Sequence, residues 1–98
     1  MSRDVKFTSK CAKQVRYLAP EIRDRHFALV LEIQTIGPSR TTWSNYGKIR
    51  GKTDCYHCHL KKGKPNYVAI WKVTVKENKL VEVRYVGTHE NADYRRIC

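Results

Sequence analysis

The densest group of reactive side chains lies in the segment CYHCHLKKGKPNYVAIW, residues 55–71, where two cysteines and two histidines share five positions. Thiolate and imidazole are common zinc ligands, and Cys55 and Cys58 have the C-x-x-C spacing of many structural zinc sites. A second pair is missing, because Cys11 and Cys98 stand alone in the sequence. A strand would also place Cys55 and Cys58 on opposite faces. We therefore expect no metal site and no cofactor, with a His-x-His pair completed by a third ligand as the alternative.

The same alternation puts His57 and His59 on one face of the strand. Imidazole gains and loses a proton near neutral pH, so two histidines can act as general base and general acid. RNA carries its own nucleophile, the 2′-hydroxyl, and metal-free cleavage then needs these two groups and cations for the phosphate. His89, in VGTHENADY, is the natural second contributor. The candidate cations are Lys61, Lys62 and Lys64. The alternative is a solvated sheet edge without chemistry.

The chain is strongly basic, with 20 Lys and Arg against 9 Asp and Glu, a net charge of +11 and a pI near 9.8. A folded basic domain most often meets a polyanion, because neutralising phosphates releases counterions. The 98 residues predict one domain, residues 1–98. No apolar run reaches the roughly 18 to 20 residues of a membrane span. The start, MSRDVKFTSK, lacks the apolar core of a signal peptide, so we expect a cytoplasmic protein with reduced cysteines and no membrane partner.

Two helices are predicted after a first strand at residues 4–9. Thr8 or Ser9 can cap the first helix, whose apolar stripe is Cys11, Val15, Leu18 and Ala19. Pro20 suits the start of the second helix, and Gly37 followed by Pro38 ends it. The apolar stripe of this second helix comprises Ile22, His26, Leu29, Val30, Ile33 and Ile36.

The remaining elements are a loop at residues 39–52 and three strands at residues 54–60, 67–75 and 80–86. The run YVAIWKVTV is almost continuously apolar or β-branched, which is typical of a central strand. The predicted fold is therefore α+β in the order β-α-α-β-β-β. We expect a mostly antiparallel four-stranded sheet with a helical hairpin on one face and the other face open.

The stretches CHLKKGKPNYVAIWKV and VEVRYVGTHENADY resemble the RelE/ParE toxin superfamily, and within it the YafQ-like mRNA endonucleases. The resemblance covers most of the chain as an order of elements and is most specific in the last forty-five residues. It implies a toxin that a cognate antitoxin neutralises and that cleaves mRNA on the ribosome without a metal. The histidines of the family match His59 and His89, which would then be the general base and acid in an undetermined order.

The resemblance also implies supporting residues, with departures from the family pattern. Asn66 stands where the family has an acidic residue and cannot titrate, but it can still hydrogen-bond RNA. His57 stands where the branch often has an acidic residue, and Tyr67 matches a neighbouring aromatic. Tyr94 matches a C-terminal aromatic one residue later than expected. Possible phosphate contacts without a motif are Arg84 and Arg95.

Two other functions compete with the nuclease. One is a ParE-like toxin that inhibits gyrase and cleaves nothing, which would have no need of titrating groups on the open face. The other is a non-catalytic, basic nucleic-acid-binding module, with or without a stabilising zinc ion. The expected partners of the nuclease are the antitoxin, mRNA and the ribosome, with operator DNA reached only through the antitoxin.

Overall fold

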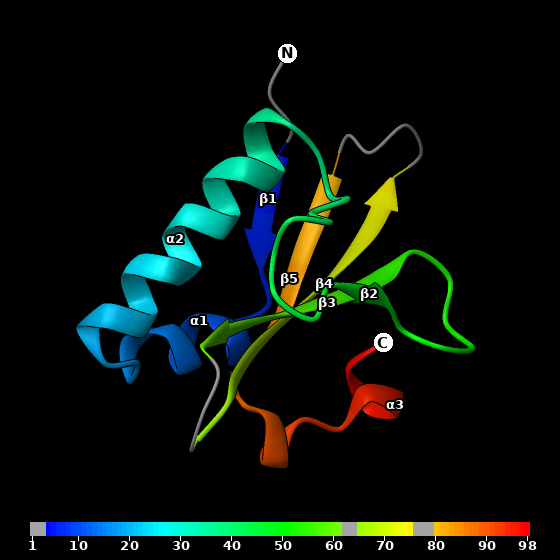
Figure 1. The fold of residues 1–98 in the computed structure, drawn as a ribbon. Helices are drawn as coiled ribbons and strands as arrows, with labels where there is room; N and C mark the ends of the chain where they lie inside the picture. The colour runs from blue at the N-terminus through cyan, green and yellow to red at the C-terminus, as the bar shows by residue number, and fades with distance from the viewer. Residues whose placement is uncertain (1–3, 62–64, 76–79) are drawn as a thin grey trace.

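Five strands form one mixed sheet in the computed structural model, which describes residues 4–61, 65–75 and 80–98 (Figure 1). Across the sheet the order is β1-β5-β4-β3-β2, with β1 parallel to β5 and the other pairs antiparallel. The predicted α+β class is confirmed. The strands are β1 (Asp4–Phe7), β2 (Gly47–Lys48), β3 (Cys55–Lys61), β4 (Tyr67–Val75) and β5 (Leu80–Thr88).

The predicted number of four strands is wrong, because the loop expected at residues 39–52 contributes β2. Gly47 pairs with His57 and Lys48 pairs with Tyr56, which places β2 at the edge of the sheet. Two residues are too few for an alternating pattern to appear in the sequence. Pairing with β3 creates this strand, so its own residues do not signal it.

The two long helices begin where their caps predicted. In α1 (Ser9–Arg16) the Thr8 hydroxyl accepts a hydrogen bond from the Cys11 amide at 3.1 Å, which satisfies one free donor of the first turn. Pro20 is the first residue of α2 (Pro20–Thr35). Gly37, two residues after the end of this helix, has a φ of 143°. Ile36 was expected in the buried stripe, which is wrong: it follows the end of the helix and is exposed.

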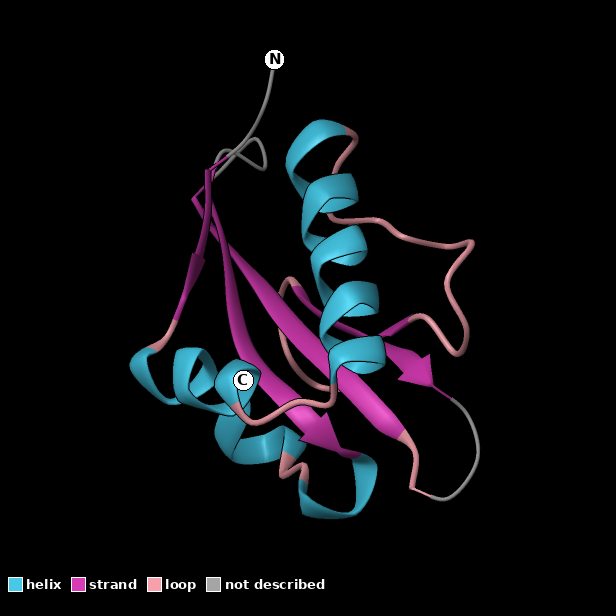
Figure 2. Ribbon diagram, turned by 90° about the vertical axis from the view of Figure 1, so that its left-hand side faces the viewer, coloured by secondary structure: helices cyan, strands magenta, loops and turns pink. Residues whose placement is uncertain are grey.

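Both helices pack on one face of the sheet, to its left in Figure 1, and Figure 2 shows α2 in front of the strands. The main core lies between these layers. Its largest member, Trp71 of β4, is fully buried and donates its indole N–H to the Pro38 carbonyl at 3.1 Å. The buried residues of this core are Cys11, Leu18, Ile22, Leu29, Ile33, Cys58, Leu60, Ala69, Trp71, Val81, Val83 and Val86.

The opposite face is partly covered, which corrects the expectation of an open face. After β5 the chain forms a 3-10 helix, η2 (His89–Asn91), and a short helix, α3 (Tyr94–Ile97), neither of which was predicted. This segment packs on a second apolar cluster on the sheet. The buried members of that cluster are Ile49, Cys55, Val68, Ile70 and Tyr85, and the segment contributes Ala92, Tyr94, Ile97 and Cys98.

A disulfide joins Cys55 to Cys98, so the expectation that all cysteines are reduced is wrong for this pair. Their Cα atoms lie 6.3 Å apart although 43 residues separate them in sequence. The return of the C-terminal segment across the sheet brings them together. Cys11 and Cys58 are buried free thiols. Among the described residues, no helix has the length and apolar character needed to cross a membrane.

Candidate functional site

His59 and His89 lie next to each other at one end of the sheet, with ring centroids 5.6 Å apart. Thirty residues separate them in the sequence, and backbone pairing brings them together. His59 pairs with Val68 of β4, and Val68 pairs with Gly87 of β5, two residues before His89. The His89 amide also donates to the Asn66 carbonyl at 2.9 Å. The positions of both histidines are thus set by the ladders of the three long strands.

His57 and Tyr94 extend this pair into a group of four rings, which we call the histidine–tyrosine cluster: His57, His59, His89 and Tyr94. The Tyr94 ring centroid lies 5.6 Å from that of His57 and 6.1 Å from that of His89. The ring of His57 lies over Gly47, where an added Cβ would come within 3.3 Å of Nε2. Strand β2 therefore gives the cluster one of its walls.

Burial shifts the pKa values of two cluster members toward the uncharged form. It lowers the pKa of His57, and the nearby His59 and His89 lower it further. Burial also raises the pKa of Tyr94, with a smaller contribution from Tyr85. His57 thus favours the neutral imidazole and Tyr94 the protonated phenol, since burial disfavours the charged form. The His57 Nδ1 atom is buried and has no hydrogen-bond partner among the described residues.

Asn66 supports the cluster through its backbone, whereas Tyr67 lies on the other face of the sheet. The Asn66 carbonyl holds the backbone of His89, and its side chain is half-buried. Tyr67 packs against the main core on the helix side of the sheet, whereas its neighbour Val68 belongs to the second apolar cluster. Because adjacent strand residues point to opposite faces, Tyr67 is separated from the histidines.

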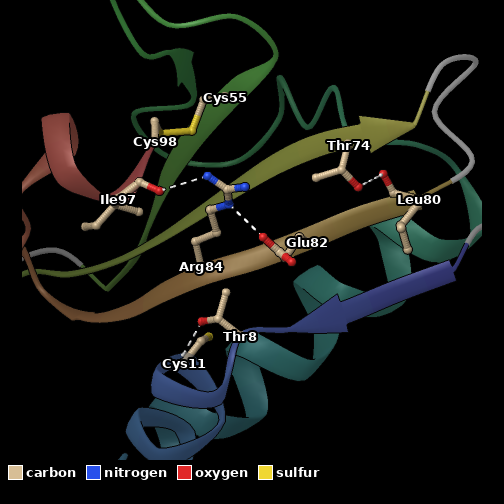
Figure 3. A network of polar contacts seen from close by, with 9 residues as sticks. All are labelled: Thr8, Cys11, Cys55, Thr74, Leu80, Glu82, Arg84, Ile97 and Cys98. Atoms are coloured by element: carbon tan, nitrogen blue, oxygen red, sulfur yellow. Dashed lines mark hydrogen bonds and ion pairs between the residues drawn. A yellow bond between two sulfur atoms is a disulfide. The ribbon is translucent and has the colours of Figure 1, made fainter.

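The predicted cations have different surroundings. Lys61 is described at the end of β3, whereas Lys62 and Lys64 lie outside the described residues. Arg95 is exposed on α3. Arg84 is engaged within the protein: its Nε donates to Glu82 at 2.8 Å and its Nη1 donates to the Ile97 carbonyl at 3.2 Å (Figure 3). The second bond ties Arg84 to the C-terminal segment, a contact that the sequence did not reveal, and the predicted phosphate contact stays a prediction.

The cysteine pair of the C-x-x-C spacing is not arranged to chelate a metal. Cys55 is in the disulfide, and Cys58 is buried on the helix side of the sheet. No group of three or more His, Cys, Asp or Glu within residues 4–61, 65–75 and 80–98 can hold a metal ion. The imidazole and phenol groups of the cluster can transfer protons and form hydrogen bonds.

A pocket of about 320 Å³ has His59 and Leu60 in its wall. The loop before β2 forms one side, where the Ser44 carbonyl accepts from the His59 amide at 2.7 Å. Helix α2 forms the other side, where Arg25 donates to the Leu60 carbonyl at 2.9 Å. The volume is at the lower end of the roughly 300–1,000 Å³ of small-ligand pockets.

No protein-family model and no curated protein sequence matches the chain. Solved structures do match. A mutant of E. coli toxin RelE in the free state superposes with a TM-score of 0.72 at 24% identity, over 94% of this chain and 88% of that one. For the YoeB dimer from Staphylococcus aureus the TM-score is 0.72 at 11% identity, over 91% and 99% of the two chains.

A third similar structure is the archaeal RelE–RelB complex from Pyrococcus horikoshii OT3, with a TM-score of 0.71 at 18% identity over 94% of this chain and 100% of that one. Each of these three superpositions covers more than nine-tenths of this chain. The chain thus has the same fold as these RelE and YoeB toxins.

Proposed function

We propose that the chain is the toxin of a type II toxin–antitoxin pair and acts as a metal-independent endoribonuclease. We place it in the YafQ-like branch, whose members cleave mRNA on the ribosome and inhibit translation. One observation carries the proposal: His59 and His89 lie with ring centroids 5.6 Å apart on a protein of net charge +11. Two imidazoles at this spacing can both contact one phosphodiester group of a bound polyanion.

In the proposed reaction one of these two histidines removes the proton of the RNA 2′-hydroxyl. The 2′-oxygen then attacks the adjacent phosphorus, and the bond to the 5′-oxygen of the next nucleotide breaks. The other histidine protonates that leaving oxygen. The products are a 2′,3′-cyclic phosphate and a 5′-hydroxyl end, so no water or metal is consumed. Proton transfer by one positioned acid or base typically accelerates a reaction by about 10²–10⁴-fold.

The other members of the cluster assist these two. His57, which burial keeps neutral, orients the neighbouring imidazoles without adding a competing positive charge. Tyr94, whose pKa burial raises further above neutrality, donates a hydrogen bond to the phosphate or stacks on a base. Lys61, with Lys62 and Lys64 in the adjoining segment, and Arg95 attract the RNA backbone. The pocket beside His59 receives a nucleotide next to the cleaved bond.

Replacement of each histidine tests the assignment. His59→Ala and His89→Ala should each lower mRNA cleavage in a ribosome-containing extract by about 10²–10⁴ and relieve growth arrest. His26→Leu is a matched control, because His26 is a buried residue of α2, which packs on the other face of the sheet. Undiminished cleavage by both His59→Ala and His89→Ala would show that these residues take no part in the reaction. Loss of cleavage in chelator, restored by zinc, would show a metal-dependent mechanism instead.

The proposed protein partner is an antitoxin that covers the basic site. Support comes from the Pyrococcus horikoshii structure, which was solved as a complex of RelE with RelB. Charge attraction between an acidic antitoxin segment and a protein of net charge +11 should weaken in salt. Coexpression with the product of an adjacent small reading frame should restore growth. Binding of the toxin to mRNA, ribosomes or operator DNA can then be measured with and without this product. Failure of any adjacent product to bind would count against the toxin assignment.

A further inference from the structure

The disulfide lies close to the histidine–tyrosine cluster. Cys55 is the first residue of β3, the strand that carries His57 and His59, and Cys98 follows α3, the helix that carries Tyr94. Figure 3 shows the bond together with Arg84, which reaches the Ile97 carbonyl from β5. The bond therefore joins the two parts of the chain whose side chains meet in the cluster.

Apart from the disulfide, α3 is held by packing on the second apolar cluster and by a few polar contacts. The helix has four residues, far below the length at which a helix is stable without tertiary contacts. Asp93 caps it through a long hydrogen bond of 3.4 Å to the Arg96 amide. Arg84 contributes one hydrogen bond to Ile97, and the side chains of Tyr94 and Ile97 are only half-buried. Without the covalent bond, the position of Tyr94 against His57 and His89 depends on these contacts.

The two cysteines differ in burial. Cys55 is fully buried, whereas Cys98 is only partly buried and is the more exposed of the two. An external thiolate would therefore attack the Cys98 sulfur, form a mixed disulfide there and release Cys55 as a thiol. A second thiol then attacks the mixed disulfide and releases Cys98. Two electrons pass to the protein, and the reducing thiols leave as their own disulfide.

The other two cysteines are unsuited to this exchange. Cys11 and Cys58 are both fully buried in the main core. Burial, with a contribution from Glu32 at Cys58, raises the pKa of each thiol to about 12. Exchange requires an accessible thiolate, so these residues are inert. The response of the protein to thiols is thus confined to the Cys55–Cys98 pair.

We propose that Cys55 and Cys98 form a thiol–disulfide exchange site that controls the RNA-cleaving cluster, with a cellular dithiol or glutathione-like thiol as the reductant. In the oxidised protein the bond fixes α3 and keeps Tyr94 against His57 and His89. In the reduced protein α3 detaches and Tyr94 leaves the cluster. Cys55 and Cys98 are thus positioning residues that act through Tyr94. The effect on activity rests on the proposed nuclease function, whereas the effect on α3 does not.

The test uses the whole protein equilibrated in glutathione buffers of graded potential, with the disulfide fraction measured by alkylation and mass spectrometry. RNA cleavage should fall several-fold in parallel with the disulfide fraction. Amide hydrogen exchange in residues 92–98 should become faster while exchange in β3, β4 and β5 stays slow. Cys98→Ser should match the reduced protein and lose its response to potential. Cys11→Ala, which leaves the bond intact, should keep the response.

The outcomes separate this proposal from the nuclease assignment. Equal cleavage by oxidised and reduced protein would overturn thiol control and leave the nuclease standing. If neither form cleaves RNA, the proposed function fails, and hydrogen exchange in residues 92–98 then decides whether the bond holds α3. A pair that stays reduced in every buffer would overturn the exchange site itself.

Discussion

The buried histidine of α2 allows a quantitative test of the structure. His26 is fully buried between the rings of Phe7 and Phe27, each with its centroid 5.6 Å away. Neither of its ring nitrogens has a hydrogen-bond partner among the described residues. Burial lowers its pKa from 6.5 to about 4. The folded protein therefore holds this imidazole neutral at a pH where the unfolded chain protonates it.

This difference links stability to pH with a definite sign. Between pH 6.5 and pH 4 the unfolded state binds more protons than the folded state, so stability falls as the pH falls. With pKa values of 6.5 unfolded and about 4 folded, lowering the pH from 7 to 4.5 costs about 2.5 kcal/mol. A loss of this size is a large share of the stability of a small domain, which is about 5–15 kcal/mol.

His26→Leu should remove this pH dependence. Leucine fills a similar space without buried polar atoms, so the variant should also gain about 1–3 kcal/mol at pH 7. Urea unfolding of both proteins at pH 7 and pH 4.5 measures the effect, with the disulfide kept intact in each. His89→Leu serves as the control and should retain the full pH dependence, because His26 is unchanged in it. Equal losses between pH 7 and 4.5 in wild type and His26→Leu would refute the reasoning.

Three further variants test other contacts by thermal or urea unfolding. Cys98→Ser removes the cross-link between two residues 43 positions apart and should lower the free energy of unfolding by up to about 4 kcal/mol. An unchanged free energy of unfolding would mean that the bond does not restrain the unfolded chain. Thr8→Ala removes the cap of α1 and should cost about 1 kcal/mol, while Thr8→Ser should retain most of it. Gly87→Ala would place a Cβ 2.7 Å from the buried Tyr85 hydroxyl, so a cost of about 1–3 kcal/mol is expected, and an unchanged midpoint would contradict this close approach.

The longer elements could be predicted because their signals are local. Thr8 and Pro20 mark helix starts through their own side chains, whatever the rest of the fold does. Alternation along β3 correctly separated Cys58 from Cys55 and the two histidines, because strand geometry dictates which side chains share a face. Ile36 shows the limit of periodicity: the pattern continues to this residue, but the helix ends before it.

The short elements could not be predicted in this way. Strand β2 has two residues and α3 has four, so each is shorter than the window in which a period can be recognised. Strand β2 is stabilised by pairing with β3, and α3 is stabilised by its contacts with the second apolar cluster and Arg84. The disulfide has the same origin, since only the return of the C-terminal segment brings Cys98 to Cys55.

The sequence by itself determined the chemistry that this protein can offer: a basic chain with two histidines on one face of a strand and a third after a later strand. The tertiary structure decided which of these groups meet. It brought His59 and His89 together through two strand ladders, added Tyr94 from α3, sent Tyr67 to the opposite face and engaged Arg84 with the C-terminal segment. The physical reason is that residue types and local periods are encoded over a few positions, whereas these contacts depend on strand register and on the path of the chain between distant segments.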